Sequence, residues 1–327
     1  MKFVKSSKKF IARIKYYGIA YLRDALSNHF ANEANYPSIL KKEESYSRLS
    51  DNEIPDELVK WFYTRTAEKF EISNPVTFNQ KIQWIKLFDI DDKKVLLADK
   101  YRVRSWVADT IGEKYLIPLI GVWKKADDID FDKLPNKFAL KCNHGSGWNI
   151  IVNDKNIINK TDVINKLNTW MNSNFAYHSG FELQYRNIPP RIIAEAYIEN
   201  DNGGVNDYKC YCFDGKLHYI QFLTDRKNGL RMAYFNKEWE LQPFVNNHPP
   251  VDYSVPKPDN LDELIYISEK LSQGFAFVRV DFYRLNSGEF KFGEMTFTPA
   301  SGTQDWRPEE TNYMLGSLLN ISGRHVP

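Results

Sequence analysis

The stretch FVRVDFYRLNSGEFKFGEMTFTPASG, residues 277–302, decides the fold. Aromatic and β-branched residues, which favour strands, fill both of its halves. Between the halves, residues 286–288 read Asn-Ser-Gly, a sequence typical of turns. The stretch therefore predicts two neighbouring antiparallel strands joined by a short loop, and its phenylalanines predict that the hairpin is well buried.

Four polar side chains are expected on one face of this hairpin. Arg279 and Asp281 are two residues apart, and alternate side chains of a strand point to the same face. Glu294 and Thr296 are related in the same way on the second strand. Two carboxylates and a hydroxyl on adjacent strands suit Mg²⁺, which keeps several waters and bridges phosphate oxygens. The alternative is a solvated strand face that carries an Arg–Glu ion pair.

A second motif, FALKCNHGSGWNIIV, occupies residues 138–152. It predicts a strand that ends near Lys141, a glycine-containing loop over residues 144–147, and a second strand. Glycines let backbone N–H groups approach an anion closely, and a lysine at a strand end supplies a fixed positive charge. The motif is not a Walker sequence, because GxxxxGK[ST] is absent. It predicts either a phosphate-binding loop or an ordinary β-hairpin with a glycine-rich turn.

A third motif begins with the apolar segment RIIAEAYI, residues 191–198. Glu195 lies near the end of this predicted strand, Asp207 follows twelve residues later, and Lys209 lies on the same face as Asp207. A strand that leaves one half of a protein and enters the other can offer its backbone to an adenine edge, while an acid binds ribose hydroxyls. The alternative is an unremarkable strand–loop–strand connection.

The remaining pattern predicts an α+β chain. Residues 55–112 carry apolar side chains at three- and four-residue steps, as helices do. From residue 134 onward, short apolar segments alternate with turns, as strands do. Two helical segments, at about 161–174 and 260–273, interrupt these strands. The sequence therefore predicts helices first and then a strand-rich body.

The order and spacing of eight segments match one family: ADKYRVRSWV (98–107), YLIPLIGVW (115–123), LPNKFALKCNHGSGWNIIV (134–152), PRIIAEAYI (190–198), DYKCYCFDGK (207–216), TDR (224–226), FVRVDFY (277–283) and FGEMTFTPASG (292–302). Over about residues 75–320 the chain resembles the ATP-grasp superfamily, which includes D-alanine–D-alanine ligase and glutathione synthetase. Within that superfamily it is similar to the TupA-like (teichuronopeptide biosynthesis) amidoligases.

The resemblance implies a fold and a division of the chain. The fold is ATP-grasp, in which two α+β subdomains grip ATP, preceded here by a helical N-terminal region. Residues 1–60 are not covered by the resemblance, and their charge and helical spacing predict a basic amphipathic helical region. Residues 61–115 would form the helical N-terminal part of the catalytic unit. Residues 116–197 would form the lid subdomain, and residues 198–327 the C-terminal core with the metal site.

The resemblance also implies roles for individual residues. ATP-binding roles fall on Lys100, Arg104, Lys141, His144, Gly145, Ser146, Gly147, Glu195, Ala196, Tyr197, Ile198 and Asp207. Metal binding falls on Asp281, Glu294 and Thr296, catalysis on Lys141, Lys209 and Arg279, and substrate binding on Arg226, Arg231, Arg279, Ser301 and Gly302. Arg104 stands where many members have a second phosphate-contacting lysine, and Lys100 is the alternative. Thr296 departs from the family's usual asparagine. His144, Asp225 and Glu294 stay open as general bases.

The implied activity is an ATP- and Mg²⁺-dependent carboxylate–amine ligase. It would form an amide through an acyl phosphate, joining an amino acid or other small amine to a uronic-acid carboxylate in surface polysaccharide (capsule) biosynthesis. Five arginines, which suit bidentate carboxylate recognition, lie near aromatic residues in the sequence. They are Arg186, Arg191, Arg226, Arg231 and Arg307. Each of them is equally compatible with an ordinary surface arginine.

Three other functions remain open. A glycosyltransferase is suggested by DIDFD, residues 128–132, because metal-dependent sugar transferases bind a nucleotide-sugar diphosphate with an Asp-x-Asp spacing. No clear βαβ pattern precedes this motif, however. A polysaccharide- or membrane-binding protein would leave Asp281 and Glu294 unexplained. An ATP-grasp kinase would stop at phosphoryl transfer to a hydroxyl.

The composition limits the class of protein. The chain has 327 residues, of which 43% are hydrophobic and 15% aromatic, enough for a sizeable core and two or three subdomains. Its formal net charge of +2 argues against a nucleic-acid binder, which is usually strongly basic. No apolar run approaches the ~18 residues of a membrane span, and no secretory signal is recognisable. We expect a cytoplasmic protein whose cysteines, Cys142, Cys210 and Cys212, are reduced.

Residues 1–30 form a basic N-terminal arm. It carries seven Lys or Arg residues and one Asp, a net charge of +6, and its apolar residues recur at helical spacing. A basic amphipathic helix can lie on an anionic membrane surface, which predicts a peripheral contact at the inner face of the membrane. The alternative is a helix that packs its apolar stripe on the body and exposes its lysines.

Overall fold

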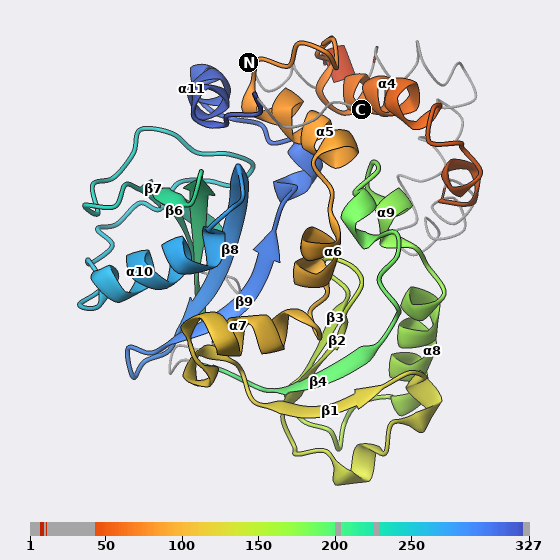
Figure 1. The fold of residues 1–327 in the computed structure, drawn as a ribbon. Coiled ribbons are helices and arrows are strands. Elements are labelled where there is room, and N and C mark those ends of the chain that lie inside the picture. Colours follow the sequence, from red (N-terminus) through yellow and green to blue (C-terminus); the bar gives the residue numbers. More distant parts are fainter. Residues whose placement is uncertain (1–6, 10, 12–42, 200–203, 225–228, 323–327) are drawn as a thin grey trace.

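Two antiparallel sheets face each other across the molecule (Figure 1). The computed structural model describes residues 7–9, 11, 43–199, 204–224 and 229–322. The first sheet has the order β1-β4-β2-β3, with β1 (Leu119–Trp123), β2 (Phe138–Cys142), β3 (Asn149–Val152) and β4 (Ile192–Ala196). The second has the order β7-β6-β5-β8-β9, with β5 (Asn206–Phe213), β6 (Lys216–Thr224), β7 (Arg231–Phe235), β8 (Phe277–Arg284) and β9 (Phe290–Thr296).

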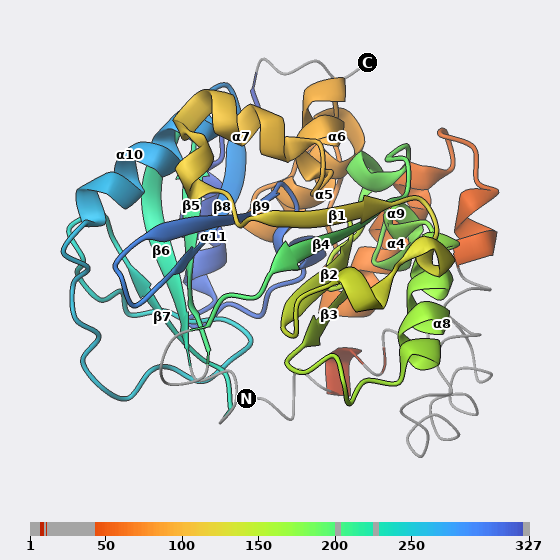
Figure 2. The same cartoon turned by 90° about the horizontal axis from the view of Figure 1, so that it is seen from below.

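Among the described residues, the helices that precede the first sheet include α4 (Ile54–Thr66), α5 (Phe78–Phe88), α6 (Asp92–Ala98) and α7 (Val103–Ile111). Figures 1 and 2 show α5, α6 and α7 along the region between the two sheets. The other helices are α8 (Lys160–Met171), α9 (Phe175–His178), α10 (Leu261–Ser272) and α11 (Glu310–Leu318). Short 3₁₀ turns are η1 (Glu113–Tyr115), η2 (Ala126–Asp128), η3 (Phe131–Lys133), η4 (Leu183–Tyr185) and η5 (Pro299–Gly302). The predicted α+β chain, with helices before strands, is confirmed.

The apolar residues of the second sheet explain which way its polar face is turned. Val280 and Phe282 of β8 are fully buried in a core shared with Leu264, Ile267 and Leu271 of α10. Because side chains alternate along a strand, the residues between them point away from α10. The face of β8 that carries Arg279 and Asp281 is therefore turned toward the first sheet and the helices between the sheets.

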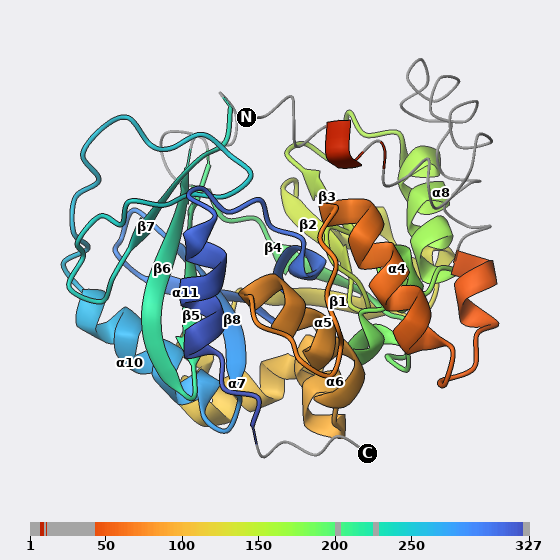
Figure 3. The same ribbon diagram turned by 90° about the horizontal axis from the view of Figure 1, so that it is seen from above.

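The opposite end of the second sheet is closed by α5 and α11, which lie beside each other (Figure 3). Helix α5 begins at Thr77, whose hydroxyl accepts from the backbone N–H of Gln80, while the Gln80 side chain accepts from the backbone N–H of Thr77. This reciprocal capping box satisfies two free N–H groups of the first turn. It fixes the start of α5, whose side chains contact the loop that follows β9.

Two sequence predictions lie partly or wholly outside what the structure tests. Most of the basic arm, residues 1–30, lies outside the described residues, so its packing and its membrane contact stay predictions. The proposed domain limits at residues 60, 115 and 197 also stay predictions. Among the described residues, no helix is long and apolar enough to cross a membrane.

Gly316→Ala is expected to destabilise the chain. A Cβ at Gly316 of α11 would lie 2.5 Å from the carbonyl oxygen of Val76 and 2.8 Å from the backbone nitrogen of Phe78. Alanine would favour the helix by roughly 0.5–1 kcal/mol, but overpacking against backbone costs about 1–3 kcal/mol. We expect a lower free energy of unfolding by urea denaturation. The control, exposed Ser317→Ala in the same helix, should change it by less than about 0.5 kcal/mol; a stabilised Gly316→Ala would contradict this packing.

Candidate active site between the two sheets

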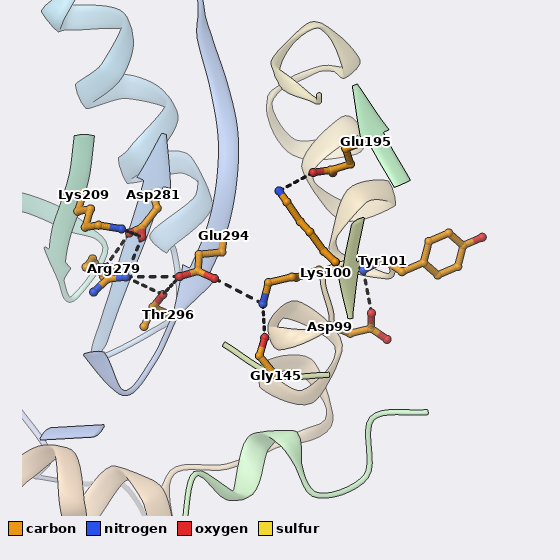
Figure 4. Close-up of polar contacts among 11 residues, drawn as sticks. Asp99, Lys100, Tyr101, Gly145, Glu195, Lys209, Arg279, Asp281, Glu294 and Thr296 are labelled. Carbon is orange, nitrogen blue, oxygen red and sulfur yellow. Dashed lines mark hydrogen bonds and ion pairs between the residues drawn. The ribbon is translucent and has the colours of Figure 1, made fainter. Parts of the chain in front are cut away.

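The β8–β9 hairpin brings together the four polar residues that the sequence placed on one face (Figure 4). In its register Asp281 is opposite Glu294, and Arg279 is opposite Thr296. The Arg279 guanidinium donates two hydrogen bonds to the Asp281 carboxylate, each 2.7 Å long. It also donates to the Thr296 hydroxyl at 3.2 Å, and that hydroxyl donates to Glu294 at 3.2 Å. The predicted hairpin and its shared polar face are thus present.

Strand β5 adds a lysine to this face. Lys209 is opposite Asp281 in the register between β5 and β8, and its ammonium donates to the Asp281 carboxylate. Asp207, two residues earlier, is buried, and one of its oxygens lies 4.0 Å from the Lys209 nitrogen. The carboxylate of Asp281 therefore has two cationic partners, one from its own strand and one from the neighbouring strand.

The carboxyl group of Glu294 is ionised at neutral pH. Burial by itself would raise the pKa of Glu294, but the charges of Lys100, Lys209 and Arg279 outweigh burial and lower this pKa to about 2. Burial likewise disfavours the charged form of Arg279, and Asp281 outweighs it and raises the Arg279 pKa. The face consequently holds full charges of both signs.

The donor set fits a magnesium ion that is shared with a phosphate. Within the described ranges, no group of three or more His, Cys, Asp or Glu side chains could hold a metal by itself. Asp281 and Glu294 offer two hard carboxylates, and Thr296 adds a hydroxyl. Mg²⁺ is usually held by one or two carboxylates together with waters and substrate phosphates. These residues would therefore hold the ion only partly, and a phosphate substrate would complete its ligands.

A second charged cluster lies across from the hairpin, on the first sheet. Glu195 of β4 accepts from Arg104 of α7 at 2.8 Å and from Lys141 of β2 at 2.6 Å. Arg104 also donates to the carbonyl oxygen of Ile117 at 2.8 Å. A small pocket lies between the sheets and is lined mainly by Lys100, Arg104, Lys141, Glu195, Phe292 and Gly293. It joins the residues predicted from the second and third motifs.

Lys100 links the hairpin face to the glycine-rich loop (Figure 4). Its ammonium lies 3.5 Å from a Glu294 oxygen and donates to the carbonyl oxygen of Gly145 in the glycine-rich loop. Buried Asp99 fixes the turn that carries Lys100, because its carboxylate accepts from the backbone N–H of Tyr101 at 2.8 Å and from the Asn143 amide at 2.8 Å. Lys100 thus contacts both the candidate metal ligand and the loop, whereas Arg104 contacts neither.

The glycine-rich loop is only partly exposed. Ser146 and Gly147 face solvent, and Gly147 has a left-handed φ of 74°. His144 is buried, its ring bonded to Asn143 at 3.2 Å and to the carbonyl oxygen of Trp170 at 3.1 Å, and burial lowers its pKa. A Cβ at Gly145 would lie 2.5 Å from the Trp148 ring. The His144 imidazole therefore lies in the core of the first-sheet subdomain, away from the exposed tip of the loop.

The predicted linker residues lie at the end of β4. Ala196, Tyr197 and Ile198 are half-buried, and the backbone N–H of Ala196 already donates to the carbonyl oxygen of Pro118 at 2.9 Å. Ser301 and Gly302 follow β9 in η5, and both are buried. In the sequence, residues 196–198 thus come just before the second sheet, and Ser301 and Gly302 come just after it.

Several predicted residues lie elsewhere. Arg231 is on β7, at the edge of the second sheet opposite β9, and pairs with Asp252 at 2.8 Å. Arg226 and Asp225 lie outside the described residues. Asp128 and Asp130 of the Asp-x-Asp motif are exposed, and Asp130 pairs with Lys133.

Three buried charged residues beside the site are missing from the sequence-based prediction: Lys86, Asp99 and Glu182. A signal for one of them exists. Asn79, Gln83 and Lys86 are spaced by four and three positions, which places them on one face of α5. This polar row is easily overlooked because it lies next to the apolar row of Phe78, Ile82 and Ile85.

A family model described as TupA-like ATP-grasp matches residues 80–320. Among similar solved structures is D-alanine–D-alanine ligase from Bacillus anthracis complexed with ATP, with 16% identity, a TM-score of 0.37, and coverage of 62% of this chain and 55% of that chain. N5-carboxyaminoimidazole synthetase from Staphylococcus aureus complexed with ADP has 15% identity, a TM-score of 0.38, and coverage of 62% of this chain and 44% of that chain. ATP-grasp ligase PsnB complexed with minimal precursor, Mg and ADP has 9% identity, a TM-score of 0.37, and coverage of 74% of this chain and 65% of that chain. The chain spans about half of the length of the first two. A search of curated proteins found no match. The match to the family model, and not these solved structures, is the finding that places the chain in a family.

Glu195→Gln is expected to lower the free energy of unfolding by about 1–3 kcal/mol. The change removes the carboxylate that pairs with both Arg104 and Lys141, and it leaves these two cations, each 14% exposed, next to each other. Chemical denaturation measures the change. The matched control is Asp132→Asn. Asp132 is 88% exposed and its partner Lys160 is 49% exposed, so this change should leave the free energy of unfolding unaltered. Equal effects of the two changes would show that Glu195 is no more than a surface partner.

Proposed function

The chain belongs to the TupA-like ATP-grasp family, and from this membership we propose that it is an ATP- and Mg²⁺-dependent carboxylate–amine ligase. ATP-grasp ligases use ATP with Mg²⁺. The observation that carries the proposal is the pairing of Asp281 with Glu294 on adjacent strands, next to Arg279 and facing Lys100. Two carboxylates amid fixed cations suit a metal-bound triphosphate better than they suit any neutral ligand.

The chemistry requires activation of the carboxylate. An amine does not displace hydroxide from a carboxylate, because hydroxide is a poor leaving group. Attack of the carboxylate oxygen on the γ-phosphorus of ATP forms an acyl phosphate and releases ADP. Attack of the amine nitrogen on the acyl carbon then forms the amide, releases phosphate and loses a proton. Alignment and charge neutralisation are the main protein contributions to such a phosphoryl transfer.

We assign the residues to this reaction as follows. Asp281 and Glu294 would hold Mg²⁺, with Thr296 as a further oxygen, and the ion would neutralise phosphate charge. Lys141 and Lys100 would bind phosphate oxygens, the latter because it lies at Glu294 and at the glycine-rich loop. Arg279 keeps its positive charge beside this face and would stabilise the charge of the acyl phosphate.

The nucleotide base and ribose would lie toward the linker between the sheets. Glu195 and the backbone of residues 196–198 would border adenine, with Arg104 placed at this end by its contact with Glu195. Asp207 would accept from the ribose hydroxyls. The pocket between the sheets has far less room than the roughly 300 Å³ at which ligand sites usually begin. The side chains of the two clusters would therefore move apart as the nucleotide enters.

The acceptor proposed here is a uronic-acid carboxylate of a surface polysaccharide or its precursor, and the second substrate is an amino acid or small amine. Support comes from the family membership and from the position of Ser301 and Gly302 directly after β9. The arginines give less support, because Arg186 pairs with Asp51 and Arg231 pairs with Asp252. We also propose that the basic arm, residues 1–30, keeps the chain at the inner face of the membrane, where such precursors are assembled.

Lys141→Ala should weaken Mg-ATP binding by roughly 1.5–3 kcal/mol, the size of a charge-assisted contact. Titration calorimetry measures the affinity, and circular dichroism confirms that the variant is folded. The matched control is Lys133→Ala, since Lys133 is 85% exposed and lies outside the pocket. Unchanged ATP affinity of a folded Lys141→Ala protein would remove Lys141 from the phosphate site.

Asp281→Asn and Glu294→Gln should each lower turnover by about two to four orders of magnitude, because metal-assisted neutralisation is worth several kcal/mol in the transition state. Release of ADP that depends on both a uronate and an amine measures turnover, below the melting temperature of each variant. Asp128→Asn and Asp130→Asn are the controls and should stay active. A glycosyltransferase predicts the reverse pattern and no consumption of ATP, so active Asp281→Asn and Glu294→Gln proteins would defeat the proposal.

A further inference from the structure

The loop that follows β9 has an unusual backbone. In η5, Ala300 (φ 47°), Ser301 (φ 52°) and Gly302 (φ 66°) are successive residues in the left-handed region. Only glycine adopts this region without cost, so the two residues with a Cβ are strained. Such a conformation persists only where the surrounding structure imposes it. We name residues 298–304 the acceptor loop, since they contain Ser301 and Gly302.

Helix α5 imposes the conformation through the polar row described above. Gln83 donates to the carbonyl oxygens of Ser301 at 3.1 Å and of Gly302 at 3.0 Å. Asn79 donates to the carbonyl oxygen of Gln304 at 2.8 Å. A Cβ at Gly302 would lie 2.3 Å from the Gln83 amide nitrogen, so the helix and the loop are in close contact. The helix thereby binds the backbone of the acceptor loop at three carbonyl groups.

Lys86 is the third residue of this polar row, and it also contacts the loop. Its ammonium donates to the carbonyl oxygen of Ser301 at 2.9 Å and to the Ser301 hydroxyl at 2.7 Å. It also donates to the carbonyl oxygen of Gly180 at 2.7 Å and to Gln83 at 2.9 Å, and it lies 4.5 Å from the centre of the Trp61 ring. The whole side chain is 0% exposed. Burial lowers the pKa of Lys86 to about 7, and a buried amino group is costly unless it is hydrogen-bonded. Two of its four acceptors belong to Ser301 of the acceptor loop.

The same junction includes a segment from the first-sheet side of the molecule. The Ser301 hydroxyl donates to the carbonyl oxygen of Ser179, and the Thr298 hydroxyl donates to the carboxylate of Glu182. Gln184 donates to the Thr298 hydroxyl at 2.7 Å. Three separate parts of the chain, α5, residues 179–184 and the acceptor loop, therefore meet at Lys86. Thr298 lies two residues after Thr296 of the candidate metal face, so the loop continues directly from that face.

We propose that Lys86 is a positioning residue that holds the acceptor loop in the left-handed conformation in which the loop receives the carboxylate substrate. Lys86 acts through Ser301 and touches no substrate itself, because its donors are used within the protein. The substrate part of the proposal rests on the proposed function. The ordering of the loop by Lys86 does not, and it can be measured in the absence of nucleotide.

Hydrogen exchange tests the ordering. In Lys86→Met, amides of residues 298–304 should exchange at least tenfold faster than in the wild-type chain, while those of β2 and β3 keep their rates. Lys81→Met is the matched control, since Lys81 is also on α5 but donates to the carbonyl oxygens of Gly316 and Leu319. It should leave residues 298–304 unchanged. If Lys86→Met does not fold, Lys86→Met/Glu182→Gln is compared with Glu182→Gln alone, because Glu182 itself accepts from Thr298 of the loop.

Kinetics tests the consequence for function. With D-glucuronate and glycine as probes, the KM for glucuronate should rise at least tenfold in the Lys86 variant, while the KM for Mg-ATP stays within twofold. The proposal would be overturned if the amides of residues 298–304 exchanged no faster in the folded variant than in the wild-type chain. An equal rise of both KM values, which indicates a general structural defect, would overturn it too. A wild-type chain that binds no Mg-ATP would instead defeat the proposed ligase function and leave the exchange result standing.

Discussion

The guanidinium of Arg279 allows two carboxylates to lie opposite each other on adjacent strands. Without a cation between them, Asp281 and Glu294 would repel each other, and burial would raise the pKa of Glu294 further. Arg279 donates twice to Asp281 and lies 3.5 Å from Glu294, and with Lys100 and Lys209 it keeps the Glu294 pKa at about 2. The Glu294 carboxylate that would bind a metal is thus already ionised, and Asp281 is oriented beside it.

The same balance governs the space between the sheets. Each cation of the pocket has a carboxylate partner: Lys141 and Arg104 share Glu195, and Lys100 lies at Glu294. On the proposed function, ATP binding is then an exchange of partners, in which phosphate oxygens and a divalent ion take over contacts that the protein's own charges make with one another. An exchange of this kind leaves no buried charge without a partner, which would be the costly alternative.

The sequence predicted the features that depend on local rules. Alternation and a turn sequence place Asp281 beside Glu294, because both rules act over a few residues. The contact of Lys86 with Ser301 spans 215 positions, and nothing local indicates it. The position of Arg231 on the strand at the far edge of the sheet could not be predicted either, because strand order is set by tertiary packing. The sequence could not decide whether Lys100 or Arg104 is the better candidate for a phosphate contact, because the turn at Asp99 sets the direction of Lys100.

The helical region before the sheets therefore contributes residues to the candidate active site. The two sheets supply the carboxylates and Lys141, but α7 supplies Arg104, and the turn before it supplies Lys100. Helix α5 holds the backbone of the acceptor loop, whose left-handed residues would relax toward ordinary conformations without those contacts. Because α5 also meets residues 179–184 through Lys86, a shift of the first-sheet side relative to α5 would be transmitted to the loop that follows the metal face. Such a coupling would link the grip on the nucleotide to the shape of the acceptor site by packed contacts alone.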